Sequence, residues 1–325
     1  MSEIQQHPGS APAERPHHRF DELVARAQQG PPVVTAVVHP CDQVSLESVL
    51  EAARLKLILP ILVGPALRIQ QAAARSMLDI AGLEIVDAEH SHDAARKAVE
   101  LVRQGRVEAL MKGSLHTDEL MAAVVARETG LRTARRISHC FVMDVPGHPT
   151  ALMITDAAVN IAPSLKDKVD IVQNAIDLAH ALGAPEVRVA ILSALETVSP
   201  DIPSTIEAAA LCKMADRGQI TGAVLDGPLA LDNAISPDAA AIKKIASPVA
   251  GRANVLVVPD LEAGNMLAKS LSFLAGADAA GIVLGARVPI ILTSRADAEI
   301  TRLASCAVAS LLAAARRSTL SAAIH

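Results

Sequence analysis

Two adjacent polar residues, Ser294 and Arg295, have side chains that suit the binding of a phosphoryl group. They stand in VPIILTSRAD, where an apolar strand-like run ends and a helix-like run begins. The backbone N–H groups and the dipole at a helix start both favour an anion, and arginine adds a planar, bidentate donor. Ser294 and Asp297 also have the spacing of a capping box, which explains these two residues without a ligand. Capping leaves Arg295 unexplained, so an anion site stays open beside it.

Other polar residues follow apolar runs in the same way. In an open α/β sheet such positions gather at the carboxyl ends of the strands, where ligands bind. The candidates are Lys112, Gly113, Ser114, Thr117, Asp156, Asn160, Asp226, Gly227, Gly264 and Asn265. Each also has a structural explanation: Thr117 as a helix N-cap, and the others as polar turns that satisfy backbone groups.

Five segments, in order along the chain, resemble the phosphate acetyl/butyryltransferase family. They are KGSLHTDEL, MITDAAVNIAPS, LDGPLALDNAIS, SPVAGRANVLVVPDLEAGN and LTSRAD, and the similarity extends over residues 32–315. The resemblance implies an α/β fold of two doubly wound domains with a cleft between them, like that of isocitrate and isopropylmalate dehydrogenases. It also implies transfer of a short acyl group between CoA and inorganic phosphate, by direct attack of the CoA thiol on the acyl phosphate.

The same resemblance implies roles for individual residues. Arg295 would hold the phosphate, Ser294 would stabilise the thiolate or the oxyanion, and Asp297 or Glu299 would take the thiol proton, as a positioned carboxylate does. Two candidates stand for the base because this segment is one residue shorter than the family pattern. Ala157 stands where the acetyl-type pattern often has a cysteine, so this segment is closer to the butyryl branch.

The densest basic cluster of the chain is formed by Arg132, Arg135 and Arg136. A solvated surface is the ordinary explanation, but the phosphates of CoA also need such a cluster, and Arg136 is our candidate contact. His90 and His92 lack further ligands, so a solvated helix start explains them better than a metal site. We predict no metal and no tightly bound cofactor, with CoA as a substrate. The resemblance implies a homodimer.

Composition limits the functions of the chain. A net charge of −5 argues against general binding to nucleic acid or to a membrane surface. The sequence holds no apolar run of membrane-spanning length, and its four cysteines are scattered without a CxxC pair. These features predict a soluble cytoplasmic protein with reduced thiols.

The organisation of the chain follows from its alternating strand-like and helix-like runs, which predict parallel strands with right-handed crossovers. The stretch from Ile137 to Ile154 breaks the alternation, because PGHP separates two apolar runs, and it predicts a hairpin or a domain-crossing ribbon near a domain junction. With 325 residues, two domains are expected. We expect a disordered tail over residues 1–18, a first domain of residues 19–148 plus 298–325, and a second domain of residues 149–297.

Two other functions stay open at this point. One is a decarboxylating dehydrogenase of related fold, which would use a divalent metal and NAD and would need clustered carboxylates or histidines. The other is a non-catalytic relative that binds CoA or an acyl phosphate. Intact Ser294 and Arg295 argue against the second of these.

Overall fold

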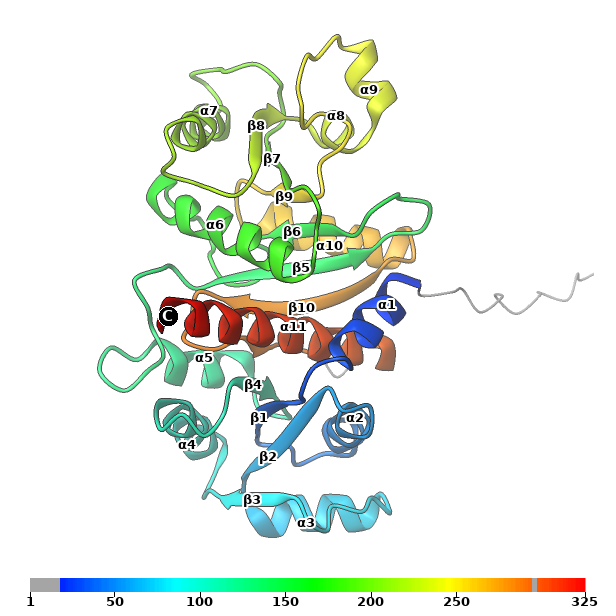
Figure 1. The fold of residues 1–325 in the computed structure, drawn as a ribbon, viewed down its shortest axis with the longest axis vertical. Coiled ribbons are helices and arrows are strands. Elements are labelled where there is room, and N and C mark those ends of the chain that lie inside the picture. Colours follow the sequence, from blue (N-terminus) through cyan, green and yellow to red (C-terminus); the bar gives the residue numbers. More distant parts are fainter. Residues whose placement is uncertain (1–17, 294–296, 325) are drawn as a thin grey trace, which may run out of the picture.

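The computed structural model describes residues 18–293 and 297–324, and an eleven-stranded sheet runs through the molecule (Figure 1). The strand order is β3-β2-β1-β4-β11-β10-β5-β6-β9-β7-β8. The strands are β1 (Val33–Val38), β2 (Ile58–Gly64), β3 (Glu84–Asp87), β4 (Ala109–Lys112), β5 (Ser138–Asp144), β6 (Leu152–Thr155), β7 (Arg188–Leu192), β8 (Val224–Leu229), β9 (Val255–Val257), β10 (Asp278–Leu284) and β11 (Ile290–Ile291). This confirms the α/β class.

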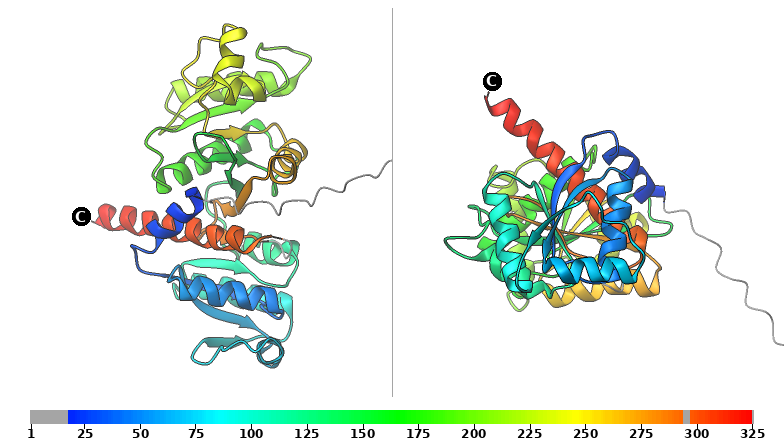
Figure 2. Two further views of the ribbon diagram at one scale, coloured as in Figure 1. Left: turned by 90° about the vertical axis from the view of Figure 1, so that its right-hand side faces the viewer. Right: turned by 90° about the horizontal axis from the view of Figure 1, so that it is seen from below.

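Helices cover both faces of this sheet (Figures 1 and 2). They are α1 (His18–Ala27), α2 (Gln43–Arg54), α3 (Ala66–Arg75), α4 (Ser91–Arg103), α5 (Thr117–Val125), α6 (Leu165–Ala181), α7 (Pro203–Asp216), α8 (Leu231–Ile235), α9 (Pro237–Ile242), α10 (Leu261–Leu274) and α11 (Glu299–Ile324). Polar caps fix several of their starts: Asp42 accepts from the backbone N–H of Ser45 at 2.8 Å, and Asp260 accepts from that of Ala263 at 2.8 Å. Such caps satisfy N–H groups that have no partner within the helix.

The sheet is mixed. Strands β1 to β4, β11 and β5 run one way, while β10, β6, β9, β7 and β8 run the other way. The predicted hairpin between Ile137 and Ile154 is confirmed, because β5 and β6 pair antiparallel. One expectation was wrong: the carboxyl ends of β8 and β9 do not lie at the same edge of the sheet as the end of β11, since these strands run in opposite directions.

The hydrophobic core is continuous on one face of the sheet and divided on the other. Within β1, Val37 belongs to the largest cluster and Val38 to a second one; within β9, Val257 belongs to the largest cluster and Leu256 to a third. Because successive strand residues point to opposite faces, the largest cluster covers one face alone. The helices α1, α2, α3, α6, α7 and α11 contribute to it.

The opposite face carries two separate clusters. Helices α4 and α5 pack over β1 and β4, whereas α8, α9 and α10 pack over β6 and β9. On this face the middle of the sheet, on β10 and β5, carries Gly281 and His139, which belong to neither cluster. The interruption of the core therefore falls on the two strands that join the halves of the sheet.

The last helix, α11, packs against α1, α2 and β10 (Figures 1 and 2). It thus returns to the half of the sheet that holds the start of the described chain. In the described residues, no helix is both long enough and apolar enough to cross a bilayer.

Candidate functional site

The turn after β4 packs tightly against the end of β1. Ser114 donates its hydroxyl to the backbone carbonyl of His39 at 2.7 Å, and the His39 imidazole Nδ1 lies 3.0 Å from the same Oγ. The backbone N–H of Gly113 donates to the carbonyl of Val38 at 2.9 Å. The Lys112 ammonium donates to the carbonyl of Gly113 at 3.2 Å. A cation, a hydroxyl and an imidazole therefore meet at one edge of the sheet.

This turn requires a glycine. A Cβ on Gly113 would lie 2.5 Å from the carbonyl oxygen of Val38 and 2.8 Å from that of His39. His39 itself has φ of 56°, which is uncommon for a residue with a side chain. Burial first, and then the charge of Arg68, lower the pKa of His39, while Glu119 and Asp42 act in the opposite direction. The imidazole is therefore neutral at physiological pH.

Thr117 does not cap α5. The N-cap is His116, whose backbone N–H donates to the Glu119 carboxylate at 3.2 Å, and Thr117 is the first residue of the helix. The N-cap interpretation of Thr117 was therefore wrong by one position. The residue lies at the helix start, where α5 follows the turn of Lys112 and Ser114.

Asp156 organises the loop between β6 and α6. Its Oδ1 accepts from the backbone N–H groups of Ala158 and Val159, each at 3.0 Å. Its Oδ2 accepts from the backbone N–H of Asn160 at 3.2 Å and from the Asn160 amide at 2.5 Å. Asp156 and Asn160 are both 3% exposed. Both carboxylate oxygens thus hold the loop in shape.

Arg136 joins this loop to the segment before β5. Its Nε donates to Oδ1 of Asn160 at 2.7 Å, and its Nη1 lies 3.6 Å from the Asp167 carboxylate. The Asn160 amide also donates to the carbonyl of Ile137 at 2.9 Å. The structure therefore brings Arg136, Asp156 and Asn160 together, as neighbours of the strand that carries His139.

Gly264 and Asn265 lie within α10 and not in a turn, so their assignment to a turn was wrong. The helix begins after its cap Asp260, four residues before Gly264. A Cβ on Gly264 would lie 2.8 Å from Cγ2 of Val258 and 2.9 Å from the carbonyl oxygen of Asp156. The glycine is needed for close approach of the helix to the loop. Asn265 donates to the carbonyl of Ala157 at 3.4 Å.

His139 is near both the chain that follows β11 and the loop of Asp156. A Cβ on Gly281 would lie 3.1 Å from His139 Nε2 and 3.0 Å from the carbonyl oxygen of Leu292. The imidazole and the chain that leaves β11 are therefore neighbours across Gly281. The imidazole is 2% exposed, and its Nδ1 has no hydrogen-bond partner among the described residues. Burial lowers the pKa of His139 to about 4, although the charge of Asp156 acts to raise it.

After β11, Leu292 and Thr293 precede Ser294 and Arg295, the first candidates singled out in the sequence. Ser294 and Arg295 lie outside the described residues, so the capping box with Asp297 does too. Asp297 accepts from the Arg302 guanidinium through its backbone carbonyl. Glu299 is exposed and begins α11.

Asp226 and Gly227 are not brought to this region. They lie inside β8, an edge strand, where Asp226 pairs with Ala190 of β7. Their assignment to a turn after a strand was wrong. Strand β8 is separated from β6 by β9 and β7, so the distance is about 14 Å at the usual spacing of strands.

Sequence reasoning did not single out His39 or His139. His39 directly follows the apolar run VVTAVV, which is the same signal that selected Lys112. His139 stands alone inside the apolar strand SHCFVMD. A histidine in such a strand is most often a core residue, and only the interrupted core shows that this one faces the middle of the molecule.

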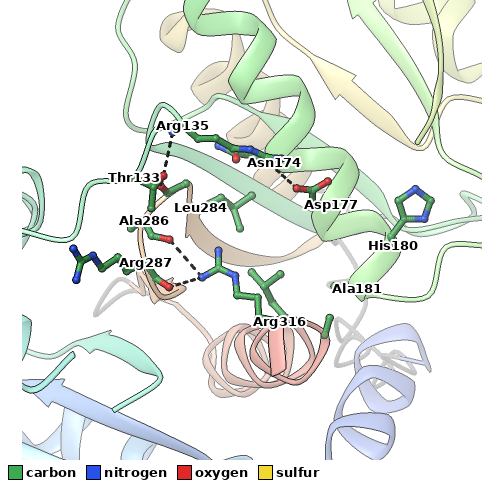
Figure 3. A pocket seen from close by; sticks show the side chains of 13 residues that line it. Thr133, Arg135, Asn174, Asp177, His180, Ala181, Leu284, Ala286, Arg287 and Arg316 are labelled. Atoms are coloured by element: carbon green, nitrogen blue, oxygen red, sulfur yellow. Dashed lines mark hydrogen bonds and ion pairs between the residues drawn. The ribbon is translucent and has the colours of Figure 1, made fainter. Parts of the chain in front are cut away.

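A cavity of about 730 Å³ lies elsewhere, between α6, α11 and the chain that follows β10 (Figure 3). Of its lining residues only Arg135, a member of the basic cluster, was considered in the sequence, and none is a predicted site residue. It borders Leu284 and Leu312, which belong to the continuous core. It is therefore on the face of the sheet opposite His139.

Comparisons with known proteins agree with the resemblance. A family model described as phosphate acetyl/butaryl transferase matches residues 88–310. The phosphate acetyltransferase of Rhizobium meliloti is 67% identical over 306 residues, which are 94% of this chain and 97% of that protein. The solved structure of a branched-chain phosphotransacylase from Enterococcus faecalis V583 is 29% identical with a TM-score of 0.75, and the match covers 86% of this chain and 99% of that chain.

One further solved structure is similar in fold alone. It is a 4-hydroxythreonine-4-phosphate dehydrogenase from Klebsiella pneumoniae, which is 13% identical with a TM-score of 0.52. The match covers 87% of this chain and 99% of that chain. The architecture of the mixed sheet is thus shared by proteins that are named for different activities.

Proposed function

Because the chain belongs to the phosphate acetyl/butaryl transferase family, we propose that it transfers an acetyl group between CoA and inorganic phosphate. The observation that carries this choice is the 67% identity with a phosphate acetyltransferase over nearly the whole of both chains. The branched-chain phosphotransacylase is more distant, at 29% identity. The metal- and NAD-dependent dehydrogenase is not favoured, since only likeness of fold supports it.

In the proposed reaction the CoA sulfur attacks the carbonyl carbon of acetyl phosphate. A carbon–sulfur bond forms, the bond from this carbon to the phosphate oxygen breaks, and phosphate leaves with the bonding electrons. The thiol proton passes to a carboxylate, because a free thiol is mostly protonated at neutral pH. The reverse reaction uses the same groups.

The site is proposed to lie in a cleft between two doubly wound domains, of residues 19–148 plus 298–325 and of residues 149–297. Support comes from the divided core, since the helices over one half of this face share no cluster with those over the other half. Lys112, Gly113, Ser114 and Thr117 would line one wall, and Arg136, Asp156, Asn160, Gly264 and Asn265 the other. His139 would stand at the floor. The distant Asp226 and Gly227 have the weakest support.

Arg295 is proposed to hold the phosphate, and Ser294 to stabilise the thiolate or the oxyanion. Both follow Thr293 directly in the chain, and Thr293 comes after Leu292, the neighbour of His139 across Gly281. A neutral imidazole there adds no cation that would compete with Arg295 for the phosphate.

For the base, we favour Asp297 over Glu299. The pKa of Arg54 is raised, first by its hydrogen bond to Glu51 and more weakly by the charge of Glu299. Arg54 belongs to α2, which covers the face opposite His139. Glu299 is therefore near enough to α2 for its charge to act on Arg54. Asp297→Asn should lower kcat and change its pH profile, whereas Glu299→Gln should leave both within about threefold of wild type.

The whole proposal is tested by CoA-dependent, arsenate-sensitive breakdown of acetyl phosphate and butyryl phosphate side by side. One methylene is worth about 1–3 kcal/mol in an apolar pocket, so we expect a preference of roughly 10-fold or more for acetyl phosphate. Arg295→Met should lower kcat/KM by about 100-fold or more. The matched control is Arg217→Met, which removes an exposed guanidinium from the end of α7. Near wild-type turnover of the Arg295 variant would refute the site.

We also propose a cytoplasmic homodimer. All four cysteines are free, which fits a reducing compartment. Large apolar side chains are exposed near the end of α10, where Phe273 is 85% and Leu274 86% exposed. Light scattering coupled to size-exclusion chromatography should give twice the mass of the chain, and Phe273→Glu should shift the protein toward monomer.

A further inference from the structure

The cavity of about 730 Å³ combines an apolar floor with a cationic rim (Figure 3). Leu284, Ala286 and Leu312 form part of the floor and are each at most 5% exposed. Three arginines line it, Arg135, Arg287 and Arg316, and the guanidinium group of Arg287 is directed away from the cavity (Figure 3). Its volume lies within the range of small-molecule sites in proteins. Its composition suits a ligand that is apolar in one part and negatively charged in another.

The cations of the rim are not equally neutralised. Arg135 forms an ion pair with Asp177, with Nη1 and Oδ2 2.5 Å apart. Arg316 instead donates through Nη1 to the backbone carbonyls of Ala286, at 3.4 Å, and Arg287, at 3.1 Å. Carbonyl groups accept hydrogen bonds but carry no net charge. Among the described residues, neither Arg287 nor Arg316 has a carboxylate within ion-pair distance.

The environment of Arg316 makes its charge costly. Burial is the main reason that the pKa of Arg316 is lowered, and the charge of Arg135 adds to this effect. Asp177 acts in the opposite direction, but it is already paired with Arg135. Arg316 is half-buried, and a charge that is partly removed from water without an ionic partner is costly until an opposite charge approaches it. A bound anion would supply that charge.

We propose that this cavity is a binding site for a small molecule that carries a dianionic group, such as a phosphate monoester, on an apolar portion. The anionic group would bind Arg316, because a guanidinium group pairs with phosphate or carboxylate in a bidentate manner. The apolar portion would lie on Leu284 and Leu312. The site is separate from the acyl-transfer region, because the sheet stands between the cavity and His139.

The test is isothermal titration calorimetry of the full chain with 1-naphthyl phosphate, a phosphate monoester on an apolar ring. We expect one molecule to bind per chain. Inorganic phosphate alone and 1-naphthol alone should each bind at least tenfold more weakly, because each lacks one of the two recognised parts. Equal affinity for either of these and for the complete probe would overturn the proposal.

Variants locate the binding. Arg316→Met keeps most of the apolar stem and should weaken binding at least tenfold, and Ala181→Leu, which fills the cavity without changing a charge, should do the same. If the first variant does not fold, the second still decides. Lys112→Met and Arg217→Met are controls and should change the affinity less than twofold. Loss of binding in Lys112→Met with full binding in Arg316→Met would place the probe in the acyl-transfer region and refute the cavity site.

Discussion

Acid should destabilise this protein through one buried histidine. His139 is 2% exposed, and burial lowers its pKa to about 4 from an ordinary value of 6.5. In the unfolded chain the imidazole takes up a proton near its ordinary pKa, whereas in the folded protein it stays neutral until about pH 4. The unfolded state therefore binds more protons between these values, and folding stability falls as the pH is lowered through them.

The size of the effect follows from the two pKa values. A shift of one unit corresponds to about 1.4 kcal/mol, so the full loss below pH 4 is about 3 kcal/mol. Most of it, roughly 2–3 kcal/mol, is already lost at pH 4.5 by the same relation. The group is fully buried, so solvent does not reduce this value. His139→Gln removes the titrating group and should abolish this part of the pH dependence.

The assay is urea unfolding followed by circular dichroism, at pH 7.5 and at pH 4.5, for wild type and His139→Gln. Carboxylates also contribute to acid lability, but they are common to both proteins. The free energy of unfolding of the variant minus that of wild type should therefore rise by roughly 2–3 kcal/mol between pH 7.5 and pH 4.5. His92→Gln, which removes an exposed histidine, controls for the substitution as such. If the free energy of unfolding fell by the same amount between pH 7.5 and pH 4.5 in wild type and His139→Gln, the reasoning would be refuted.

Three further predictions concern the packing of the candidate site. Gly113→Ala should lower the free energy of unfolding by about 2–3 kcal/mol, because its Cβ would lie 2.5 Å from a backbone oxygen. The control is Gly30→Ala, where the nearest atom to the new Cβ is 3.8 Å away. It should change the free energy of unfolding by less than about 0.5 kcal/mol in the same urea titration. Asp156→Ala leaves three backbone N–H groups without their acceptor and should lower the free energy of unfolding by about 3 kcal/mol or more. Asp156→Asn should lower it less. Equal stability of the two variants would contradict this role of Asp156. Burial raises the pKa of the Cys41 thiol to about 11, so its alkylation by iodoacetamide at pH 8 should be at least about tenfold slower than that of the urea-unfolded chain, as mass spectrometry would show.

The sequence predicts the elements of this fold well where apolar runs are long. VVTAVV forms β1, the run around Leu59 forms β2, and the interrupted run at PGHP forms the antiparallel pair of β5 and β6. Strand direction was not predictable in the same way. Alternating strands and helices indicate parallel pairing between neighbours, but one antiparallel hairpin and the antiparallel β10 reverse the direction of half the sheet.

Some predicted site residues were placed in the correct kind of element and others were not, depending on the local sequence signal. Lys112 is the last residue of β4, and Gly113, Ser114 and Asp156 to Asn160 lie in loops after strands, as expected, because a polar residue at the end of a short apolar run ends the strand there. Gly227 and Gly264 were assigned to turns and lie in a strand and a helix instead. Sequence shows that a glycine is present, but not whether the chain needs its conformational freedom or its lack of a side chain.

The lack of a side chain at three glycines explains how the site is assembled. None of Gly113, Gly264 and Gly281 has a positive φ, yet a Cβ on each would lie within 3.0 Å of another part of the chain. Gly113 allows β4 to approach His39, Gly264 allows α10 to approach Asp156, and Gly281 leaves room for both the His139 imidazole and the carbonyl of Leu292. Each glycine thus stands where two elements meet beside a polar side chain. Because a Cβ at any of these points would collide with the chain, the three glycines allow His39, His139 and Asp156 to lie close to neighbouring elements, which suits a region that must keep polar groups fixed in the gap of a divided core.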